Sequence, residues 1–324
     1  MQKNIFIILV TLLFINCKQM TVAQSQVESV NDSALEKTKV SEVADIINFL
    51  ASDELGGRDT GSEGLEKAAQ FIENEFKKYG VVPYFDTYRD DFDVKGVKTY
   101  NVVGYLKGTD EKLAKETIIL GAHFDHIGTA KEVNGDTIAN GANDNAAGSC
   151  AVISLAKQFA QLKNNKRSIL FVLFGAEEVG LQGSIHLAEV LKKKNINLYT
   201  MVNFEMIGVP LNDKPYKAYI TGYNMSNMAK KMNEYSGQEL IGYLPKAEEF
   251  QLFRRSDNYP FFQQFNVPCQ TISTFDFTNY EYYHHVDDEA SEMNFEFMAT
   301  FINECVPVIT KIANTTDKEI KLTK

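Results

Sequence analysis

The apolar positions along the chain follow two patterns, a helical spacing in some segments and short continuous runs in others. Apolar residues spaced three and four apart predict a helix that starts near Ser41 and a second helix that Ser62 caps and Gly80 ends. Short apolar runs predict six strands, with helices in most of the intervals between them: residues 99–105, 117–121, 168–174, 199–204, 217–221 and 269–273.

This alternation predicts an α/β fold with three layers, an α/β/α sandwich in which helices cover both faces of a mixed, mostly parallel, twisted sheet. Open sheets of this kind bind their ligands beyond the carboxyl ends of the strands. A chain of 324 residues is compatible with one large core, so we expect a single domain at residues 41–324.

The N-terminal segment has the features of an export signal. Lys3 precedes an apolar run from Ile5 to Ile15, which is too short to span a bilayer. Residues 1–17 resemble a bacterial lipoprotein signal, in which Cys17 becomes the lipidated first residue; an ordinary signal peptide cut before Gln24 is the alternative.

Either signal predicts an exported protein, in the bacterial periplasm, attached to the outer membrane or at the cell surface. The polar residues 18–40 are predicted to form a tether without a steady period. Any membrane contact is expected only through a lipid on Cys17.

Charge and cysteine usage exclude some classes of function. The 33 basic and 43 acidic residues give a net charge of −10 without a basic stripe, which argues against nucleic-acid binding. Beyond Cys17 only three cysteines remain, so at most one disulfide can form. We expect Cys150 and Cys269, which lie in apolar segments, to be buried free thiols.

Histidine and carboxylate side chains follow three of the predicted strands. His123 comes after the first of these strands, the pair Glu177-Glu178 after the second and Glu205 after the third. Acidic pairs usually face solvent, but these positions lie at the edge of the sheet where ligands bind. Because a metal ion needs several such ligands at one spot, the pattern suggests a two-metal hydrolase.

Motifs in a fixed order make the chain resemble the aminopeptidase family with two co-catalytic zinc ions, which is related to the glutamate carboxypeptidase, transferrin-receptor and glutaminyl cyclase folds. The resemblance covers residues 41–310 and lies in an opening segment at 50–58, His-x-Asp at 123–125, Asp-Asn-Ala at 144–146, Glu-Glu at 177–178, Asn-Phe-Glu-Met-Ile-Gly at 203–208 and Tyr-His at 283–284. It implies the zinc exopeptidase fold, which is phosphorylase/hydrolase-like, for residues 41–324.

The resemblance also implies a site with two divalent metal ions, expected to be Zn²⁺. It implies five metal ligands: His123 and Glu205 for one ion, Glu178 and His284 for the other, and Asp144 as the bridge between them.

Three further residues have roles that the resemblance implies. Glu177 would be the general base for metal-bound water, and Asp125 would hydrogen-bond the imidazole of His123. Tyr283 would stabilise the oxyanion of the tetrahedral intermediate.

Four positions leave questions open. Glu205 stands where relatives commonly have Asp, and Asn258 replaces the His of a Ser-Asp-His motif, which leaves metal preference and the role of Asn258 undecided. His126 and His285 are neighbours of the proposed ligands, and we expect them on the surface or behind the ligands. His284 is favoured over His285 as the ligand because the spacing to Asp287 copies the family pattern.

The function implied is that of an exported zinc aminopeptidase, which hydrolyses N-terminal residues from peptides with a hydroxide that bridges two metal ions. A glutaminyl cyclase, which uses one zinc, is an alternative, but the retained pair His123 and Glu205 argues against it. A carboxypeptidase or dipeptidase is another, if Arg254 and Arg255 bind a substrate carboxylate and are not simply surface arginines. A binding module of the transferrin-receptor kind, without activity, is the alternative from another class.

Overall fold

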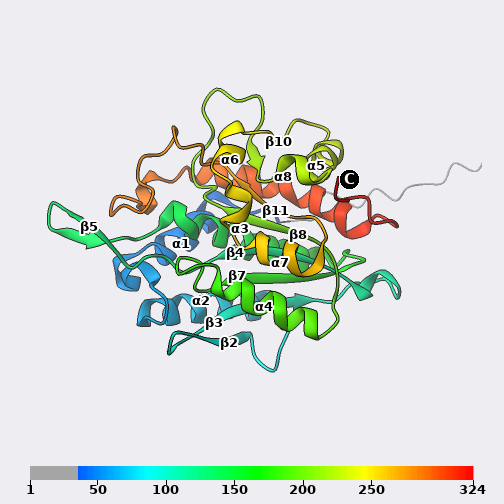
Figure 1. Cartoon of the computed structure of the whole chain (residues 1–324), viewed down its shortest axis with the longest axis horizontal. Coiled ribbons are helices and arrows are strands. Elements are labelled where there is room, and N and C mark those ends of the chain that lie inside the picture. The colour runs from blue at the N-terminus through cyan, green and yellow to red at the C-terminus, as the bar shows by residue number, and fades with distance from the viewer. Residues whose placement is uncertain (1–35, 324) are drawn as a thin grey trace, which may run out of the picture. The chain divides into compact units, whose positions relative to one another are not determined.

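A nine-stranded mixed sheet forms the centre of the computed structural model, which describes residues 36–323 (Figure 1). The strand order is β1-β3-β7-β4-β8-β11-β9-β10, and β2 pairs with the outer part of β3. Four central strands run parallel to one another: β7 Ser168–Phe174, β4 Glu116–His123, β8 Asn197–Glu205 and β11 Cys269–Ser273. On either side an antiparallel neighbour follows, β3 Val97–Leu106 beside β7 and β9 Ala218–Ile220 beside β11.

All six predicted strands are present, and the structure adds five that the sequence pattern missed. These are short or polar: β1 Val82–Pro83, β2 Arg89–Val94, β10 Ile241–Gly242 and the separate hairpin of β5 Thr129–Val133 with β6 Asp136–Ile138. Strands of two or three residues show no recognisable period, and β2 has three aspartates among its six residues.

Helices cover both faces of the sheet, which confirms the three-layer prediction (Figure 1). Five pack on one face: α1 Val40–Leu50, α2 Glu63–Tyr79, α3 Ala147–Leu162, α5 Met228–Ser236 and α8 Phe295–Asn314. On the other face lie α4 Gln182–Lys193 and α7 Asn258–Phe265, while the short α6 Pro245–Glu249 sits beyond β9 and β10.

Successive residues of the central strands enter different cores. In β4, Ile118 and Leu120 pack with the larger core around α3, whereas Ile119 packs with α4 and α7 on the opposite face. Every residue of β7 is buried. A strand covered on both faces is therefore apolar throughout, which explains why the sequence shows unbroken apolar runs there.

Helix boundaries follow the predicted caps at α2 and differ at α1. The Ser62 side chain accepts a hydrogen bond from the Leu65 N–H at 3.1 Å, and Gly80 ends α2 with φ of 78°. Helix α1 begins at Val40, one residue earlier than expected, because the Glu42 carboxylate accepts a hydrogen bond from the backbone N–H of Lys39. Ser41 lies inside the first turn and is not the cap.

The compact part of the chain begins earlier than the predicted boundary at Ser41. Thr38 is buried, and its N–H donates to the Asn303 side chain of α8 at 3.0 Å. The last residues of the predicted tether therefore pack against the domain. The predicted signal at residues 1–17, Cys17 and tether residues 18–35 lie outside the described residues.

Between residues 36 and 323, no helix has the length and apolar character needed to cross a membrane. Cys150, Cys269 and Cys305 are buried free thiols, as expected for the first two.

Candidate metal centre

The predicted ligands come from five segments that meet at the carboxyl edge of the parallel strands. His123 is the last residue of β4 and Glu205 the last of β8, and Glu178 follows the end of β7. Asp144 comes from the turn before α3, and His284 from the loop between β11 and α8. Because β7, β4 and β8 are adjacent and parallel, their carboxyl ends bring these side chains together.

Asp144 lies between two histidines, one at each carboxylate oxygen. His123 Nε2 is 3.3 Å from Asp144 Oδ1, and His284 Nε2 is 3.3 Å from Asp144 Oδ2. The same His284 nitrogen is 3.2 Å from Glu178 Oε2. A carboxylate with its two oxygens directed to two different histidines has the arrangement of a bridge between two cations.

The donor set fits divalent metal ions. Two groups each have ligand atoms within 4.8 Å of one another: His126, Asp144, Glu178 and His284 in one, and His123, Glu177 and Glu178 in the other. His284 Nε2 is buried without a hydrogen-bond partner, although two carboxylates lie next to it. Imidazole nitrogens facing carboxylate oxygens are the ligands that Zn²⁺ and similar ions take.

The turn that carries Asp144 is held by side chains from elsewhere in the fold. Helix α3 begins only at Ala147, so Asp144 lies in the turn Ala142–Ala146 that precedes it. The Asp288 carboxylate accepts hydrogen bonds from the N–H groups of Asn143 at 2.7 Å and Asp144 at 3.0 Å. Asn145 accepts from Gly148 and donates to the Phe204 carbonyl at 3.0 Å, which ties the turn to β8.

Arg58 supports the same region from inside the protein. Its guanidinium is 1% exposed and donates only to backbone carbonyls: those of Leu50, Phe124, Asn140 and Gly141. Burial lowers the pKa of Arg58 to about 10, while four nearby carboxylates oppose this shift, so the side chain stays charged at neutral pH. Arg58 thus connects the end of β4 with the segment that leads to Asp144.

Asp125 fixes the loop after β7 through its carboxylate. The N–H groups of Glu177 and Glu178 donate to its two oxygens at 3.1 and 3.3 Å. The nearest Asp125 atom to His123 Nδ1 is the backbone carbonyl oxygen at 3.1 Å, whereas the carboxylate oxygen is 3.9 Å away. A proton on Nδ1 directed to this carbonyl leaves Nε2 free to face Asp144.

Neighbouring Glu177 and Glu178 differ in their preference for a proton. Burial raises the pKa of Glu177 well above its usual range; His123 opposes the shift, and Asp257 adds to it. Burial and Asp144 also act to raise the pKa of Glu178, but contacts with His126 and His284 outweigh them and hold that pKa below its usual value. The pair therefore combines one carboxyl group that favours a proton with one that favours the ionised form.

Glu205 does not join either group of ligand atoms among the described residues. Its carboxylate accepts a hydrogen bond from the Ser256 hydroxyl, which itself accepts from Asn203 at 3.0 Å. Burial raises the pKa of Glu205 to about 7, with His123 opposing the shift. The role of Glu205 as a metal ligand stays a prediction.

Asn258 has a structural place in the fold. It is fully buried, its amide donates to the carbonyls of Phe253 at 3.2 Å and Cys269 at 3.1 Å, and its oxygen accepts from Thr271 at 2.8 Å. These bonds join the start of α7 to β11 and to the turn at Leu252–Arg254. The preceding Asp257 is also fully buried, and burial raises its pKa to about 7.

The two extra histidines have different surroundings. His285 is partly exposed and lies 3.4 Å from Asp287 through Nδ1, away from the ligand groups. His126 is fully buried, which excludes the surface position and leaves the expected position behind the ligands, and its Nδ1 lies 2.9 Å from Glu178 Oε1. Its burial follows from the close fit against Gly141, where even a Cβ atom would come within 2.6 Å of the His126 ring.

A pocket of about 110 Å³ opens beside Glu205 and Tyr283. Tyr283 is 49% exposed and its ring stacks on His284 with a centroid distance of 4.0 Å. The pocket also includes Arg255 and a mixture of aromatic and hydroxyl side chains: Tyr219, Phe275, Phe277, Thr221, Thr271 and Ser273.

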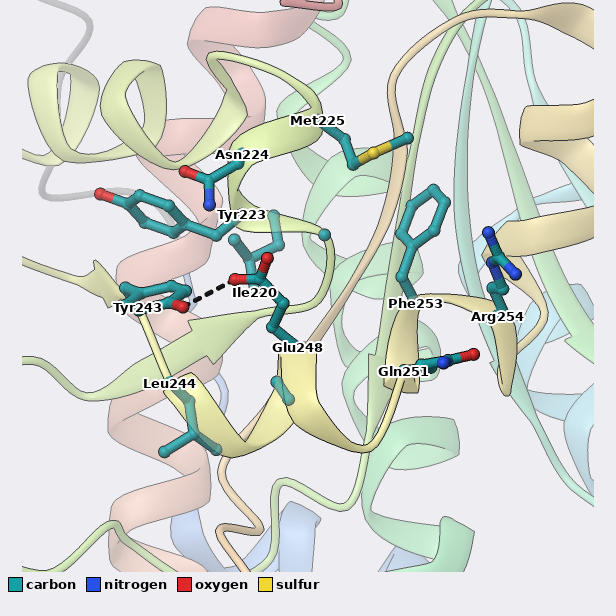
Figure 2. A pocket seen from close by; sticks show the side chains of 12 residues that line it. Ile220, Tyr223, Asn224, Met225, Tyr243, Leu244, Glu248, Gln251, Phe253 and Arg254 are labelled. Atoms are coloured by element: carbon teal, nitrogen blue, oxygen red, sulfur yellow. Dashed lines mark hydrogen bonds between the residues drawn. The ribbon is translucent and has the colours of Figure 1, made fainter.

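A larger pocket of about 310 Å³ lies between β9, β10, α6 and the turn at Leu252–Arg254 (Figure 2). Aromatic rings of Tyr223, Tyr243 and Phe253 line it, and the Tyr243 hydroxyl donates to Glu248 at 2.7 Å. Arg254 borders this pocket while Arg255 borders the other, so the two arginines do not form a common carboxylate clamp.

Sequence reasoning missed four residues that shape the site: Arg58, Ser256, Asp257 and Asp288. Arg58 and Asp257 each stand inside a motif that the sequence shows, but nothing local indicates that they are buried. Asp288 follows Asp287, and only the fold shows which of the two faces the Asp144 turn.

Comparison with known proteins gives a family and a fold. The model of peptidase family M28 matches residues 101–308, more than half of the chain. Leucine aminopeptidase 2 of Trichophyton equinum is 28% identical over 179 residues, which cover 54% of this chain and 34% of that protein. The chain thus spans about a third of the length of the curated relatives it matches.

Two solved structures illustrate the shared fold. The Legionella pneumophila LapA aminopeptidase has a TM-score of 0.67 at 20% identity, covering 86% of this chain and 73% of that one. The Fimbriiglobus ruber glutaminyl cyclase has a TM-score of 0.66 at 18% identity, covering 84% and 95%. The fold alone therefore includes both kinds of enzyme, whereas the family match and the converging histidines and carboxylates establish that this chain belongs to peptidase family M28.

Proposed function

We propose that the protein is a zinc-dependent aminopeptidase that releases N-terminal residues from peptides. The observation that carries the proposal is the position of Asp144, whose two oxygens each lie 3.3 Å from a different histidine. Relatives named zinc metalloprotease and leucine aminopeptidase support the metal and the exopeptidase reaction. The two ions would lower the pKa of a water molecule, so that hydroxide is available near neutral pH for attack on the peptide carbonyl.

The remaining steps of the reaction would depend on side chains of this protein. His123, Asp144, Glu178, Glu205 and His284 are the proposed metal ligands. Glu177, a buried carboxyl group with a raised pKa, is suited to accept a proton and later return it to the leaving amine. Asp125 would keep Glu177 in place through the backbone bond at 3.1 Å.

The pocket beside Glu205 is the proposed position for the side chain of the N-terminal residue. Its volume of about 110 Å³ is enough for one side chain, and Tyr283 stands between it and the metal ligand His284. From this place the Tyr283 hydroxyl is available to donate to the developing oxyanion. Peptides with a free amine are the proposed substrates.

Export is part of the same proposal and rests on residues 1–17 alone. Cys17 would become the lipidated N-terminus in a bacterial periplasm, at the outer membrane or at the cell surface. Intact-mass analysis of the mature protein tests it, since acyl chains on Cys17 support the lipoprotein and a plain N-terminus before Gln24 contradicts it.

Metal content and hydrolysis of aminoacyl p-nitroanilides, measured on wild type and Glu177→Gln, test the activity. We expect two metal ions per chain, loss of activity with a chelator, and a Gln variant that keeps both ions while its kcat falls about 10²–10⁴-fold. Glu189→Gln is the matched control, because Glu189 is an exposed residue of α4.

Three results would contradict the proposal in different ways. A wild type that binds no metal would exclude a metallopeptidase. Cyclisation of a glutaminyl peptide without release of a residue would identify a glutaminyl cyclase. Equal cleavage of N-acetylated and free peptides, with loss of activity on C-terminal amides, would identify a carboxypeptidase.

A further inference from the structure

We infer that His126 is a metal ligand, and that it completes a four-residue site with Asp144, Glu178 and His284. The inference rests on the proposed metallopeptidase function and deepens it. Family resemblance does not suggest this role, since it assigns only His123 and Asp125 in the same motif. The geometry of the four side chains supports it.

Each of the four side chains has a ligand atom within 4.8 Å of those of the other three. His126 Nδ1 is 2.9 Å from Glu178 Oε1 and 3.8 Å from Asp144 Oδ2. His284 Nε2 closes the group at 3.2 Å from Glu178 Oε2 and 3.3 Å from Asp144 Oδ2. Ligand atoms around a tetrahedral Zn²⁺ with bonds of 2.0–2.2 Å lie roughly 3.3–3.5 Å apart. The four contacts here range from 2.9 to 3.8 Å and so lie on both sides of that separation.

The position of His126 is built into the fold. Gly141, with φ of 60° and no side chain, leaves room for the ring, and the Arg58 guanidinium holds the Gly141 carbonyl at 2.9 Å. The rings of His126 and His284 approach each other edge to face with centroids 5.6 Å apart.

This ligand makes the two metal sites unequal. With His126, this ion would have two histidines and two carboxylates as protein ligands, one more than the other ion, and the attacking water would take a fifth position. The other ion keeps His123, the second oxygen of Asp144 and Glu205, whose carboxylate is bonded to Ser256. We therefore infer one tightly held ion and one that exchanges more readily.

The test of this inference is the Zn²⁺ affinity, measured by competition with a chromophoric chelator. It is compared among the wild type, His126→Ala, His126→Asn and the control His285→Asn. An asparagine places an N–H near the position of Nδ1, so it can still donate to Glu178, but an amide nitrogen does not bind zinc. We expect both His126 variants to bind the tighter ion about 100-fold more weakly or worse, and His285→Asn to match wild type.

The inference would be overturned if His126→Asn kept the wild-type zinc affinity within about threefold while His126→Ala lost it. His126 would then be a hydrogen-bond donor behind Glu178. X-ray absorption of wild type loaded with one Zn²⁺ is independent of any variant. Two imidazoles at that ion support the inference, and one imidazole overturns it. A wild type that binds no zinc would overturn the proposed function as well. A wild type with two bound ions and peptidase activity, together with unchanged zinc affinity in His126→Asn, would overturn this inference alone.

Discussion

Neighbouring residues in this site differ because of what surrounds them. Glu177 and Glu178 are identical in type and adjacent in sequence, yet burial raises the pKa of Glu177 while contacts with His126 and His284 lower that of Glu178. His126 and His285 differ in the same way, since one is buried against Glu178 and the other is partly exposed beside Asp287. Residue type and spacing suggest candidates, and only the environment assigns their roles.

Replacement of Arg58 tests how much this buried guanidinium, which donates only to backbone carbonyls, contributes to stability. Arg58→Met would leave the carbonyls of Leu50, Phe124, Asn140 and Gly141 without this donor. We expect the free energy of unfolding to fall by about 3–5 kcal/mol in urea denaturation. The exposed Arg255→Met should change it by less than about 0.5 kcal/mol. Equal stability of the two variants would contradict a supporting role for Arg58.

Asn258 offers a second test at the level of one residue. Asn258→Ala removes one donated and one accepted bond to β11 and one donated bond to the carbonyl of Phe253, so we expect a loss of about 1–3 kcal/mol in unfolding free energy. Metal content measured by mass spectrometry should not change, because the Asn258 side chain bonds Phe253, Cys269 and Thr271 and none of the proposed ligands. Loss of a metal ion in this variant would show that the position has a direct part in the site.

At the scale of elements, the site depends on where strands end and how tightly helices approach them. The turn of Asp144 is tied to β8 through Asn145, and the first turn of α3 passes close to the end of the same strand. A Cβ added at Gly148 would lie 2.3 Å from the Phe204 carbonyl oxygen. The absence of a side chain at Gly148 therefore sets the distance between α3 and the residue before Glu205.

Gly148→Ala is expected to separate α3 from β8 and to disturb Glu205 and Asp144 together. The conflict is with backbone, so it cannot be relieved by rotating a side chain, and we expect a loss of about 1–3 kcal/mol in unfolding free energy. Weaker metal binding should accompany it, measured by chelator competition. Gln161→Ala, at the exposed end of α3, is the control and should leave both values unchanged. Unchanged metal affinity in Gly148→Ala would refute this coupling.

For the whole molecule, the concentration of carboxyl groups in one buried place makes stability depend on pH and metal. Burial raises the pKa values of both Asp257 and Glu205 to about 7 in the protein without metal. The unfolded chain has ordinary values near 4. Between pH 4 and 7 the native state holds protons that the unfolded chain has released, so the free energy of unfolding falls as the pH rises.

The chelated protein is therefore expected to be less stable at pH 8 than at pH 5. Each proton held only by the native state contributes a slope of about 1.4 kcal/mol per pH unit. His284, whose pKa the contacts with Asp144 and Glu178 raise to about 10 against the effect of burial, adds to the decrease above pH 6.5. Urea denaturation at the two pH values measures the difference.

Metal should reverse this trend. Bound cations favour deprotonated ligands, so added Zn²⁺ is expected to stabilise the protein more at pH 8 than at pH 5. The same urea titrations with excess zinc provide the measurement. A chelated protein whose stability rises between pH 5 and 8 would contradict the protonation of Asp257 and Glu205 in the native state.

The three-layer α/β class, the six principal strands and the segments that carry the candidate ligands can all be predicted from the sequence. Each of these features is visible in a short stretch of sequence. Burial on both faces of a strand requires a continuous apolar run, and metal-binding side chains are polar residues at strand ends. Helix α2 was also predictable, since its cap Ser62 and its terminal Gly80 act within a few residues.

Which polar residues lie buried in the site, and what they contact, depends on the packing of distant segments and could not be predicted. Arg58 donates to carbonyls up to 83 positions away in sequence, and Asp288 holds a turn 144 positions away. His126 faces Glu178 only because β4 and β7 are adjacent and Gly141 leaves space for its ring. Such contacts join residues that are distant in sequence, so they cannot be predicted from the spacing of residues within one segment. They form because the packing of the fold brings the strand ends together.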